Sequence, residues 1–211
     1  MNEKLEKYNQ KRDFARTPEP DDQSIDFSWA KQRPIFVIQK HDASTLHYDF
    51  RIEDEGVLKS WAVPKGPSTD PSVKRLAVPT EDHPLAYADF EGVIPAEEYG
   101  GGMVMVWDRG PYRNLKEMEE GAGAKSIAQQ IEDGHLTIWL EGQKVRGGYA
   151  LIRTGKGEKA RWLLIKMDDD EADARRNPTS TENRSVKTGR TMADIRQAGE
   201  TLPVEGKADG N

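Results

Sequence analysis

Residues 46–54, LHYDFRIED, alternate between apolar and polar side chains. Successive side chains of a β-strand point to opposite faces, so one face gathers the apolar residues Leu46, Tyr48, Phe50 and Ile52. The opposite face carries His47, Asp49, Arg51 and Glu53. The stretch therefore predicts a strand that buries one face. A histidine, a carboxylate and an arginine in consecutive positions of the other face indicate a function there, since a solvated face usually mixes Lys, Glu, Thr and Ser.

Seven other segments are rich in β-branched and aromatic residues and are bounded by short turns. They are residues 34–40, 57–64, 75–79, 101–108, 135–142, 149–154 and 161–167. Short helices are predicted over residues 126–134 and 114–120, which is too little helix for a parallel sheet of βαβ units. The pattern predicts an all-β, mainly antiparallel fold, a closed barrel or a sandwich, because closure removes exposed strand edges.

Composition divides the 211 residues into one domain with two polar extensions. Residues 1–30 are charged and contain prolines, and residues 31–167 hold most of the aromatic and β-branched content. Residues 168–211 contain no aromatic residue. We expect this last segment to be a polar linker or tail, because it cannot bury enough apolar surface to order itself alone. Truncation near Asp170 is then expected to leave folding and activity intact.

The amino-acid composition also excludes several classes of site. The chain has no cysteine, which excludes disulfides, thiolate catalysis and zinc sites built on Cys. A net charge of −6 argues against a protein that coats DNA indiscriminately. The sequence has no apolar run of bilayer length and its N-terminus lacks a signal-peptide segment, so we expect a cytoplasmic protein without a membrane partner.

Basic residues gather in the segment 144–166 despite the negative net charge. They are Lys144, Arg146, Arg153, Lys156, Lys159, Arg161 and Lys166, against the single acid Glu158. A cationic hairpin of this kind could contact a phosphate backbone. A solvated hairpin whose lysines protect its strand edges explains the same composition equally well.

His41, His47 and Asp49 supply two imidazoles and a carboxylate for a divalent metal ion. The strand places His47 beside Asp49, and the turn before it is long enough to return His41 to them. Nitrogen and carboxylate ligands without sulfur suit Mn²⁺, Fe²⁺, Co²⁺ or Zn²⁺ better than Ca²⁺, and three protein ligands leave positions open for catalysis. A surface His–Asp pair without a metal is the simpler alternative. Arg51 argues for the metal site over this alternative. An arginine and a metal ion are both cations, so they can lie side by side only if an anion lies between them, and phosphate is the anion that fits the guanidinium fork.

The remaining histidines give less specific signals. His83 precedes a proline, which favours an extended backbone, and Tyr87 follows four residues later. His83 could donate to a phosphate oxygen, act as a general acid, or cap a turn. His135 opens a predicted strand and is expected to be exposed. No Ser or Thr is spaced to pair with a base, so direct attack by water is the simplest hydrolytic chemistry.

Long motifs in this chain resemble the 3′-phosphoesterase domain of the DNA ligase D family, the bacterial and archaeal ligases of non-homologous end joining. They are KRDFARTPEP (11–20), FVIQKHDASTLHYDFRIEDEGVLKSWAVPKGPS (36–68), RLAVPTEDHPLAYADFEGVIPAEEYGGG (75–102) and RWLLIK (161–166). The later RSVKTGRTM (184–192) resembles the linker that follows this domain, so the chain is either a stand-alone relative or the front of a longer protein.

The resemblance implies a small closed β-barrel and a manganese-dependent enzyme that trims 3′ ends of a primer strand, with Co²⁺, Zn²⁺ or another divalent ion as alternatives. It implies that His41, His47 and Asp49 hold the metal, and that Arg51, His83 and Tyr87 engage the phosphate. Support is implied for Lys65, Arg75, Arg12, Asp13, Glu19 and Gln39. The implied partners are a DNA primer-template with a 3′-ribonucleotide or 3′-phosphate end, and the ligase, polymerase and end-binding components of end joining.

Two functions of other classes remain open on the sequence alone. A His-x-Asp pair on an all-β scaffold also serves Fe(II) and 2-oxoglutarate oxygenases, in which His135 would be the third ligand. A non-catalytic DNA-binding module could use the cationic hairpin instead. Iron-dependent turnover of 2-oxoglutarate would identify the first, and DNA binding without hydrolysis would identify the second.

Overall fold

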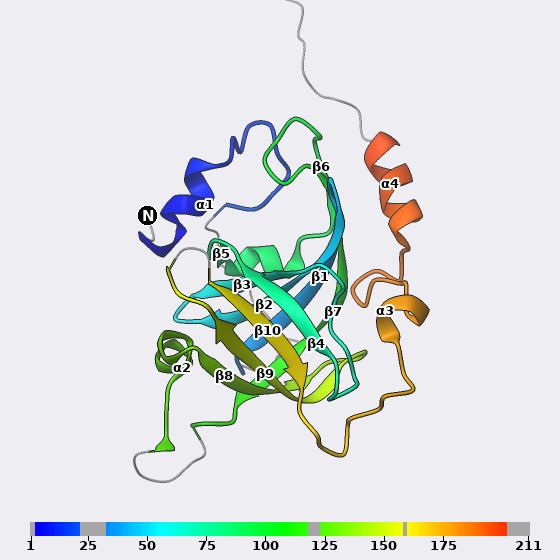
Figure 1. Ribbon diagram of the computed structural model, residues 1–211. Coiled ribbons are helices and arrows are strands. Elements are labelled where there is room, and N and C mark those ends of the chain that lie inside the picture. Colours follow the sequence, from blue (N-terminus) through cyan, green and yellow to red (C-terminus); the bar gives the residue numbers. More distant parts are fainter. Residues whose placement is uncertain (1–2, 22–32, 118–122, 158–159, 202–211) are drawn as a thin grey trace, which may run out of the picture.

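Eight antiparallel strands close into a β-barrel in the computed structural model, which describes residues 3–21, 33–117, 123–157 and 160–201 (Figure 1). Their order around the barrel is β1 (Ile35–Asp42), β2 (Leu46–Asp54), β3 (Val57–Val63), β4 (Lys74–Pro79), β10 (Arg161–Lys166), β9 (Arg146–Thr154), β8 (His135–Glu141) and β7 (Gly102–Asn114). The ring closes because β1 pairs with β7 as well as with β2. The predicted closed, mainly antiparallel all-β barrel is confirmed.

Short elements add to this barrel at one end. Strand β5 (His83–Pro84) pairs with β3, and β6 (Gly92–Ile94) pairs with β7. Both escaped prediction from sequence because strands of two and three residues carry no periodic pattern. The two are joined through the 3₁₀ helix η3 (Leu85–Asp89).

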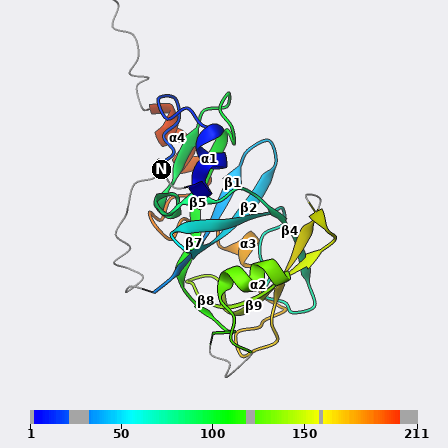
Figure 2. The same ribbon diagram turned by 90° about the vertical axis from the view of Figure 1, so that its left-hand side faces the viewer.

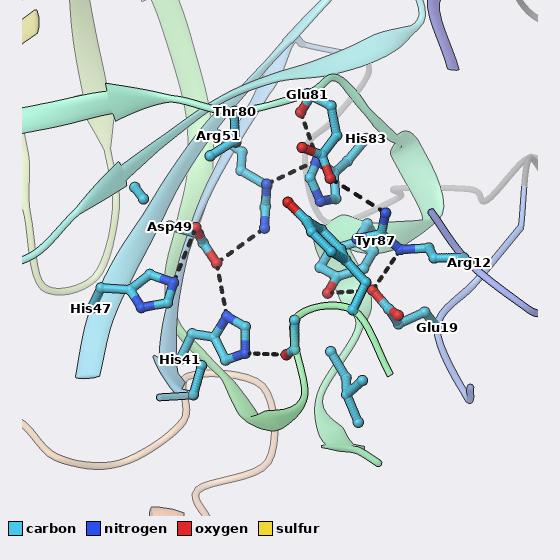
Figure 3. Close-up of a pocket in the computed structure, with 15 residues that line it drawn as sticks. Arg12, Glu19, His41, His47, Asp49, Arg51, Thr80, Glu81, His83 and Tyr87 are labelled. Carbon is cyan, nitrogen blue, oxygen red and sulfur yellow. Dashed lines mark hydrogen bonds and ion pairs between the residues drawn. The ribbon is translucent and has the colours of Figure 1, made fainter. Parts of the chain in front are cut away.

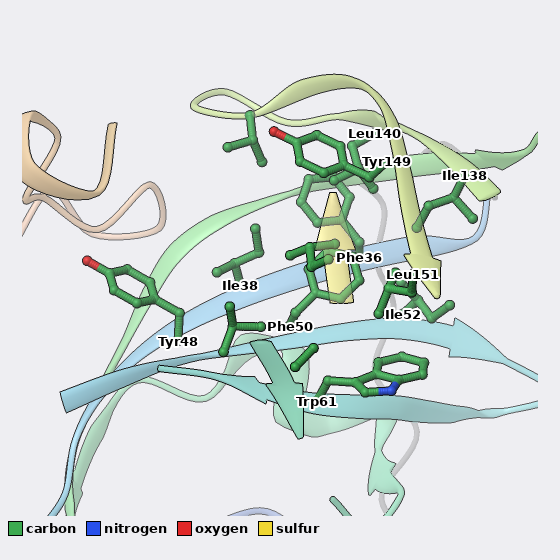
Figure 4. Close-up of a cluster of buried hydrophobic side chains, with 14 of the residues drawn as sticks. Phe36, Ile38, Tyr48, Phe50, Ile52, Trp61, Ile138, Leu140, Tyr149 and Leu151 are labelled. Carbon is green, nitrogen blue, oxygen red and sulfur yellow. The ribbon is translucent and has the colours of Figure 1, made fainter. Parts of the chain in front are cut away.

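Apolar side chains from all around the ring fill the inside of the barrel (Figure 4). They include Phe36, Ile38, Phe50, Ile52, Trp61, Tyr149 and Leu151. Burying each such side chain stabilises the fold by about 1.5–3 kcal/mol. The alternation along β2 is confirmed from Tyr48 onward, whereas Leu46 is 42% exposed because it lies at the tight turn from β1.

The helices are few and short. The predicted helix at 126–134 is present as α2 (Ile127–Asp133), where Ser126 and Gln129 form a reciprocal capping box and Gly134 ends the helix in the left-handed region. The others are η1 (Glu3–Leu5), α1 (Glu6–Gln10), α3 (Pro178–Thr181) and α4 (Met192–Thr201). Of the expected helix at 114–120, Asn114 ends β7 and residues 118–120 lie outside the described residues. No helix in the described part of the chain is long and apolar enough to span a membrane.

A second apolar cluster covers part of the outer surface of the barrel. It comprises Tyr8, Ile35, Val37, Leu58, Tyr87, Ala88 and Val106, so α1 and η3 pack over β1, β3 and β7. Figure 2 shows α1 and β5 beside the same end of β1 and β2. This cover makes the polar face of β2 a buried face, with Asp49 and Arg51 5% and 3% exposed.

The segment after Lys166 packs on the barrel, which differs from the tail expected from its composition. The indole Nε1 of Trp107 donates to the carbonyl of Glu182 at 2.7 Å, and the Val186 amide donates to the carbonyl of Val106 at 3.0 Å. Ile195 of α4 is 1% exposed. The composition of the segment did not predict this packing, because the aromatic side chain that anchors it belongs to the barrel and the segment itself supplies mainly backbone groups.

Two residues of the cationic hairpin have structural roles. The Lys144 ammonium donates to the carbonyls of Glu182 and Arg184, and burial lowers its pKa to about 8. The Lys166 ammonium is buried and contacts both carboxylate oxygens of Asp169 at 2.6 Å. These two lysines therefore hold the C-terminal segment and do not face a nucleic acid.

Candidate active site

Pairing of β1 with β2 assembles three possible metal ligands on the outer face of the barrel. His41 lies directly opposite His47, and Gln39 lies directly opposite Asp49. Nδ1 of His41 is 3.4 Å from Oδ2 of Asp49, and Nε2 of His47 is 3.7 Å from Oδ1 of the same carboxylate (Figure 3). One donor atom from each residue lies within 4.8 Å of the others. The predicted grouping of His41, His47 and Asp49 is thus a geometric fact of the fold.

The hydrogen bonds of the two imidazoles fit this cluster to a divalent cation. Nε2 of His41 lies 2.8 Å from the carbonyl of Gly100, and Nδ1 of His47 lies 2.8 Å from the carbonyl of Thr45. A carbonyl can only accept, so each of these nitrogens donates, and a ring that carries a single proton presents the lone pair of its other nitrogen to a metal ion. Those lone pairs and the Asp49 carboxylate converge, which suits Mn²⁺, Fe²⁺, Co²⁺ or Zn²⁺.

Asp49 is ionised despite its burial. Desolvation raises its pKa, but the Arg51 guanidinium and the two imidazoles outweigh that effect and hold the pKa of Asp49 well below its usual range. Conversely, burial lowers the pKa of His47, but Asp49 and the Thr45 carbonyl together outweigh burial and raise it. The carboxylate is therefore the fixed negative charge of the site.

Arg51 is held rigidly by contacts at each of its nitrogens. Nε donates to Oε1 of Gln39 at 2.9 Å, one terminal nitrogen lies 3.1 Å from Oδ2 of Asp49, and the other lies 3.1 Å from Nδ1 of His83. The guanidinium also lies 4.9 Å from the ring centre of Tyr87. An arginine has five N–H donors, so these three contacts with described residues leave two donors for an anion.

His83 reaches Arg51 because β5 pairs with β3, which places it opposite Leu58. Burial and the positive charges of Arg51 and Arg12 hold the pKa of His83 well below its usual range, so the ring is neutral. Its Nδ1 lies 2.9 Å from the carbonyl of Glu81 and 3.1 Å from Arg51. If Nδ1 carries the proton, it donates to the Glu81 carbonyl and Nε2 is an acceptor. If Nδ1 is unprotonated, it accepts from Arg51 and Nε2 is a donor.

The N-terminal segment completes the far side of the site through Glu19. Oε1 of this buried carboxylate accepts from Nε of Arg12 at 2.8 Å and from the Tyr87 hydroxyl at 3.1 Å. Its other oxygen accepts from the Thr17 hydroxyl at 2.9 Å. Burial, reinforced by Glu19, raises the pKa of Tyr87 well above its usual range, so the phenol stays protonated and donates.

Eight of the residues that the sequence singled out line one cavity of ≈ 260 Å³. They are Arg12, Glu19, His41, His47, Asp49, Arg51, His83 and Tyr87. Gln39 lies behind them, where its amide nitrogen donates to the carbonyls of Tyr87 and Phe90 at 2.9 and 3.0 Å. The sequence thus singled out eight of the 15 residues that line this cavity (Figure 3).

Three residues implied by the resemblance lie elsewhere. Asp13 is exposed, and its carboxylate accepts from the Ala15 amide at 3.1 Å. Lys65 is exposed in the turn after β3. Arg75 of β4 lies opposite Leu164, which faces the barrel interior, so its strand position points away from the outer face that carries the cavity.

His135 is exposed at the start of β8, as expected. Among the described residues, the His/Asp/Glu cluster that could hold a metal consists of His41, His47 and Asp49. His135 does not join it. The geometry therefore gives no support to an oxygenase site in which His135 is the third ligand.

Sequence reasoning missed Glu81, Tyr99 and Gly100 in the cavity wall. Glu81 lies 3.0 Å from the Lys11 ammonium and 3.4 Å from Arg12, which ties the N-terminal segment to the approach to β5. Its position two residues before His83 was the available signal. Gly100 acts through its carbonyl, and a backbone group leaves no signature in a sequence.

Replacing Gln39 by Ala is expected to destabilise the fold by about 1–3 kcal/mol, because it leaves the buried Nε–H of Arg51 and two carbonyls without their partner. Urea unfolding measures the change. Gln143→Ala is the matched control: the residue is exposed, and a change within about 0.5 kcal/mol is expected there. An equal loss in both variants would contradict this role for Gln39.

Comparison with known proteins adds a consistent set of relatives. The sequence profile described as DNA ligase D 3′-phosphoesterase domain matches residues 39–153. The chain is 51% identical over 175 residues to the multifunctional non-homologous end joining protein LigD of Pseudomonas aeruginosa, with 80% of this chain and 19% of that protein covered. It is 41% identical over 175 residues to the protein of that name from Mycobacterium bovis, with 80% and 20% covered. The chain spans about a fifth of the length of these relatives.

Proposed function

The chain belongs to the family of DNA ligase D 3′-phosphoesterase domains, and from this membership we propose that it is a metal-dependent phosphoesterase acting on 3′ ends of DNA. The observation that carries the proposal is the position of Arg51. Its guanidinium faces the same cavity as the His41, His47 and Asp49 cluster, and its contacts with the described residues leave two of its donors for a ligand. A cation site beside an arginine fork is suited to a phosphate that lies between them.

His41, His47 and Asp49 would hold the metal ion, for which we propose Mn²⁺, with Co²⁺ and Zn²⁺ as alternatives. A divalent ion bound there supplies Lewis acidity toward a phosphoryl oxygen and a bound water of lowered pKa. Three protein ligands leave coordination positions for both. The carbonyls of Gly100 and Thr45 keep the imidazoles in the tautomers that this binding requires.

The other side chains bind the phosphate and stabilise its charge. Arg51 donates its two remaining N–H groups to phosphoryl oxygens, and its contacts with Gln39 and Asp49 fix its orientation before the substrate binds. Neutral His83, when Nδ1 accepts from Arg51, presents Nε2–H to the oxygen that gains charge as the ester bond breaks. Tyr87, held by Glu19, completes the wall on the N-terminal side.

We propose a primer-template end with a 3′-terminal ribonucleotide or a 3′-phosphate as the substrate. Two activities follow: a 3′-phosphodiesterase that removes the ribonucleoside and a 3′-phosphomonoesterase. The relatives are named for non-homologous end joining, which makes that pathway of DNA repair the proposed setting, with its ligase, polymerase and end-binding components as partners.

One assay tests this proposal. A 5′-labelled primer-template with either 3′ end is incubated with the protein and Mn²⁺, Co²⁺, Zn²⁺, Mg²⁺ or no metal, and the products are resolved by length and terminal phosphate. Shortening of the ribonucleotide end and loss of the 3′-phosphate are expected with Mn²⁺ and are expected to cease on chelation. Absence of both reactions with every metal would overturn the proposal.

Arg51 and His83 are expected to contribute differently to the two reactions. A terminal phosphomonoester carries nearly two negative charges at neutral pH and a phosphodiester carries one, so the monoester depends more on cations other than the metal. We expect Arg51→Ala to slow removal of a 3′-phosphate more than removal of a 3′-ribonucleoside. His83→Ala should slow both, by roughly 10²-fold, because both share a phosphoryl transition state.

Rates on matched primer-templates give this comparison as a ratio, which is insensitive to modest differences in folding. His135→Ala serves as the control, because that exposed histidine lies outside the cavity. Equal fractional losses of both reactions in Arg51→Ala would mean that Arg51 orients Asp49 and does not select the dianion.

A further inference from the structure

A second and larger groove opens directly beside the candidate active site. Its volume is ≈ 790 Å³ against ≈ 260 Å³ for the site, and Ala43, Ile94 and Gly100 line both. Gly100 is also the residue whose carbonyl accepts from His41. The groove and the candidate active site therefore adjoin each other at these three residues.

The far wall of the groove comes from α4, which the sequence assigned to a polar tail. Ile195 of α4 is 1% exposed, and a Cβ on Gly199 would lie 2.4 Å from Val93 of β6. The helix is thus in close contact with the barrel, and Figure 1 shows it beside β6. This packing fixes Arg196 at the rim of the groove.

Arg196 is suited to meet a ligand that carries negative charge. Asp42 and Arg196 are the charged side chains among the described residues that line the groove. Arg196 is 61% exposed and lies 3.6 Å from Asp42, while its Nε lies 3.4 Å from the sulfur of Met103. An exposed ion pair at that distance is weak, so the guanidinium can turn to another anion.

We propose that this groove receives the primer strand on the 5′ side of the reacting phosphate, and that Arg196 binds a backbone phosphate of that strand. The inference rests on the proposed function and names the part of the substrate that lies outside the site. The partly exposed Val93 offers apolar contact to a sugar or base, and Arg196 matches the charge that recurs along a polynucleotide.

The positive charge of Arg196 assigns the groove to the primer strand and not to the leaving group. A ribonucleoside released from the 3′ end carries no phosphate of its own, so a cation at the rim would gain nothing from it. The strand that remains carries one phosphate per nucleotide. The groove is therefore assigned to the part of the substrate that both proposed reactions share.

The test is a length series of 3′-phosphorylated single-stranded oligonucleotides from one to six nucleotides. Anisotropy without added metal measures binding, and phosphate release with Mn²⁺ measures KM and kcat. Wild type should bind more tightly as the strand lengthens. Arg196→Ala should lose about threefold to tenfold in affinity for the longer strands and reduce the salt slope by about 0.7 for one lost contact, with kcat unchanged.

Two variants control for net charge and for the fold. Arg175→Ala removes the same charge from a side chain that is 93% exposed and lies outside the groove, and it should bind as wild type does. Arg196→Lys should keep the wild-type salt slope. The mononucleotide should bind equally well to wild type and Arg196→Ala, because it does not extend to the rim.

Three outcomes would overturn the inference. Arg196→Ala could retain the length dependence and salt slope of wild type, or lose affinity for the mononucleotide to the same extent. It could also slow release of a 3′-ribonucleoside while leaving 3′-phosphate substrates unaffected, which would place the leaving nucleoside in the groove. If wild type releases no phosphate from these strands or from a 3′-phosphorylated primer-template, the proposed function fails, while the anisotropy series still decides whether Arg196 binds the strand.

Discussion

Replacing Asp49 by Asn is expected to lower metal-dependent hydrolysis by roughly 10²-fold or more, because it removes the negative charge on which the candidate site converges. The carboxylate faces both imidazoles and also contacts Arg51 at 3.1 Å. Its charge would offset part of the charge of a divalent ion, and its contact with Arg51 orients the guanidinium. Asn keeps the shape of the side chain, so the loss would report charge and not packing.

Binding of the metal gives a readout that does not depend on turnover. A ligand that binds the native state raises the unfolding temperature, so Mn²⁺ should stabilise wild type and should stabilise Asp49→Asn much less. His41→Ala and His47→Ala should behave in the same way. His135→Ala and Asp13→Asn should respond to Mn²⁺ as wild type does, because both residues are exposed outside the cavity. Full activity and a full Mn²⁺ shift in Asp49→Asn would remove Asp49 from the ligand set.

The part of this site that could be predicted from the sequence is the part encoded locally. His41, His47 and Asp49 lie within nine residues, and one strand, one turn and the return of the chain suffice to bring them together. The period of two in β2 fixed which side chains share a face. Arg51 followed from the same alternation, since it is two residues beyond Asp49.

The rest depends on contacts between distant segments that leave little trace in a sequence. His83 meets Arg51 because a two-residue strand pairs with β3, and Gly100 contributes a carbonyl. Likewise Lys65 and Arg75 look suitable by charge, but the turn after β3 and the pairing of β4 with β10 direct their positions away from the cavity. Charge and composition alone could not separate them from Arg12, which the N-terminal segment carries to Glu19.

The C-terminal segment shows the limit of composition as a guide to order. A segment without aromatic residues cannot form a core of its own, but it can complete one that already exists. Glu182 and Arg184 offer carbonyls to Lys144, and Glu182 also accepts from Trp107. The carbonyls are the same in every sequence, so their partners on the barrel decide whether the segment packs.

Ending the chain at Met167 is therefore expected to lower the free energy of unfolding by about 3–6 kcal/mol relative to a chain that ends at Thr201. The cut exposes the surface that Ile195 buries, at about 1.5–3 kcal/mol for such a side chain, and removes the acceptors of the Trp107 indole and the Lys144 ammonium. Urea unfolding followed by tryptophan fluorescence measures the difference. Equal stability of the two chains would restore the view of a free tail.

The same cut should also weaken activity, because the segment supports the element that carries Tyr87. The Lys187 ammonium contacts the carboxylate of Asp89 at 2.7 Å, and the Arg190 guanidinium contacts that of Glu91 at 2.8 Å. Asp89 ends η3 and Glu91 lies two residues later, so both acids adjoin the carbonyls of Tyr87 and Phe90 that hold Gln39 behind Arg51. Should the short chain fail to fold, Ile195→Ala in the full chain tests the packing alone, with an expected loss of about 2–5 kcal/mol. A loss of stability in Ile195→Ala together with an unchanged rate in Arg190→Ala would show that the segment stabilises the barrel without positioning the site.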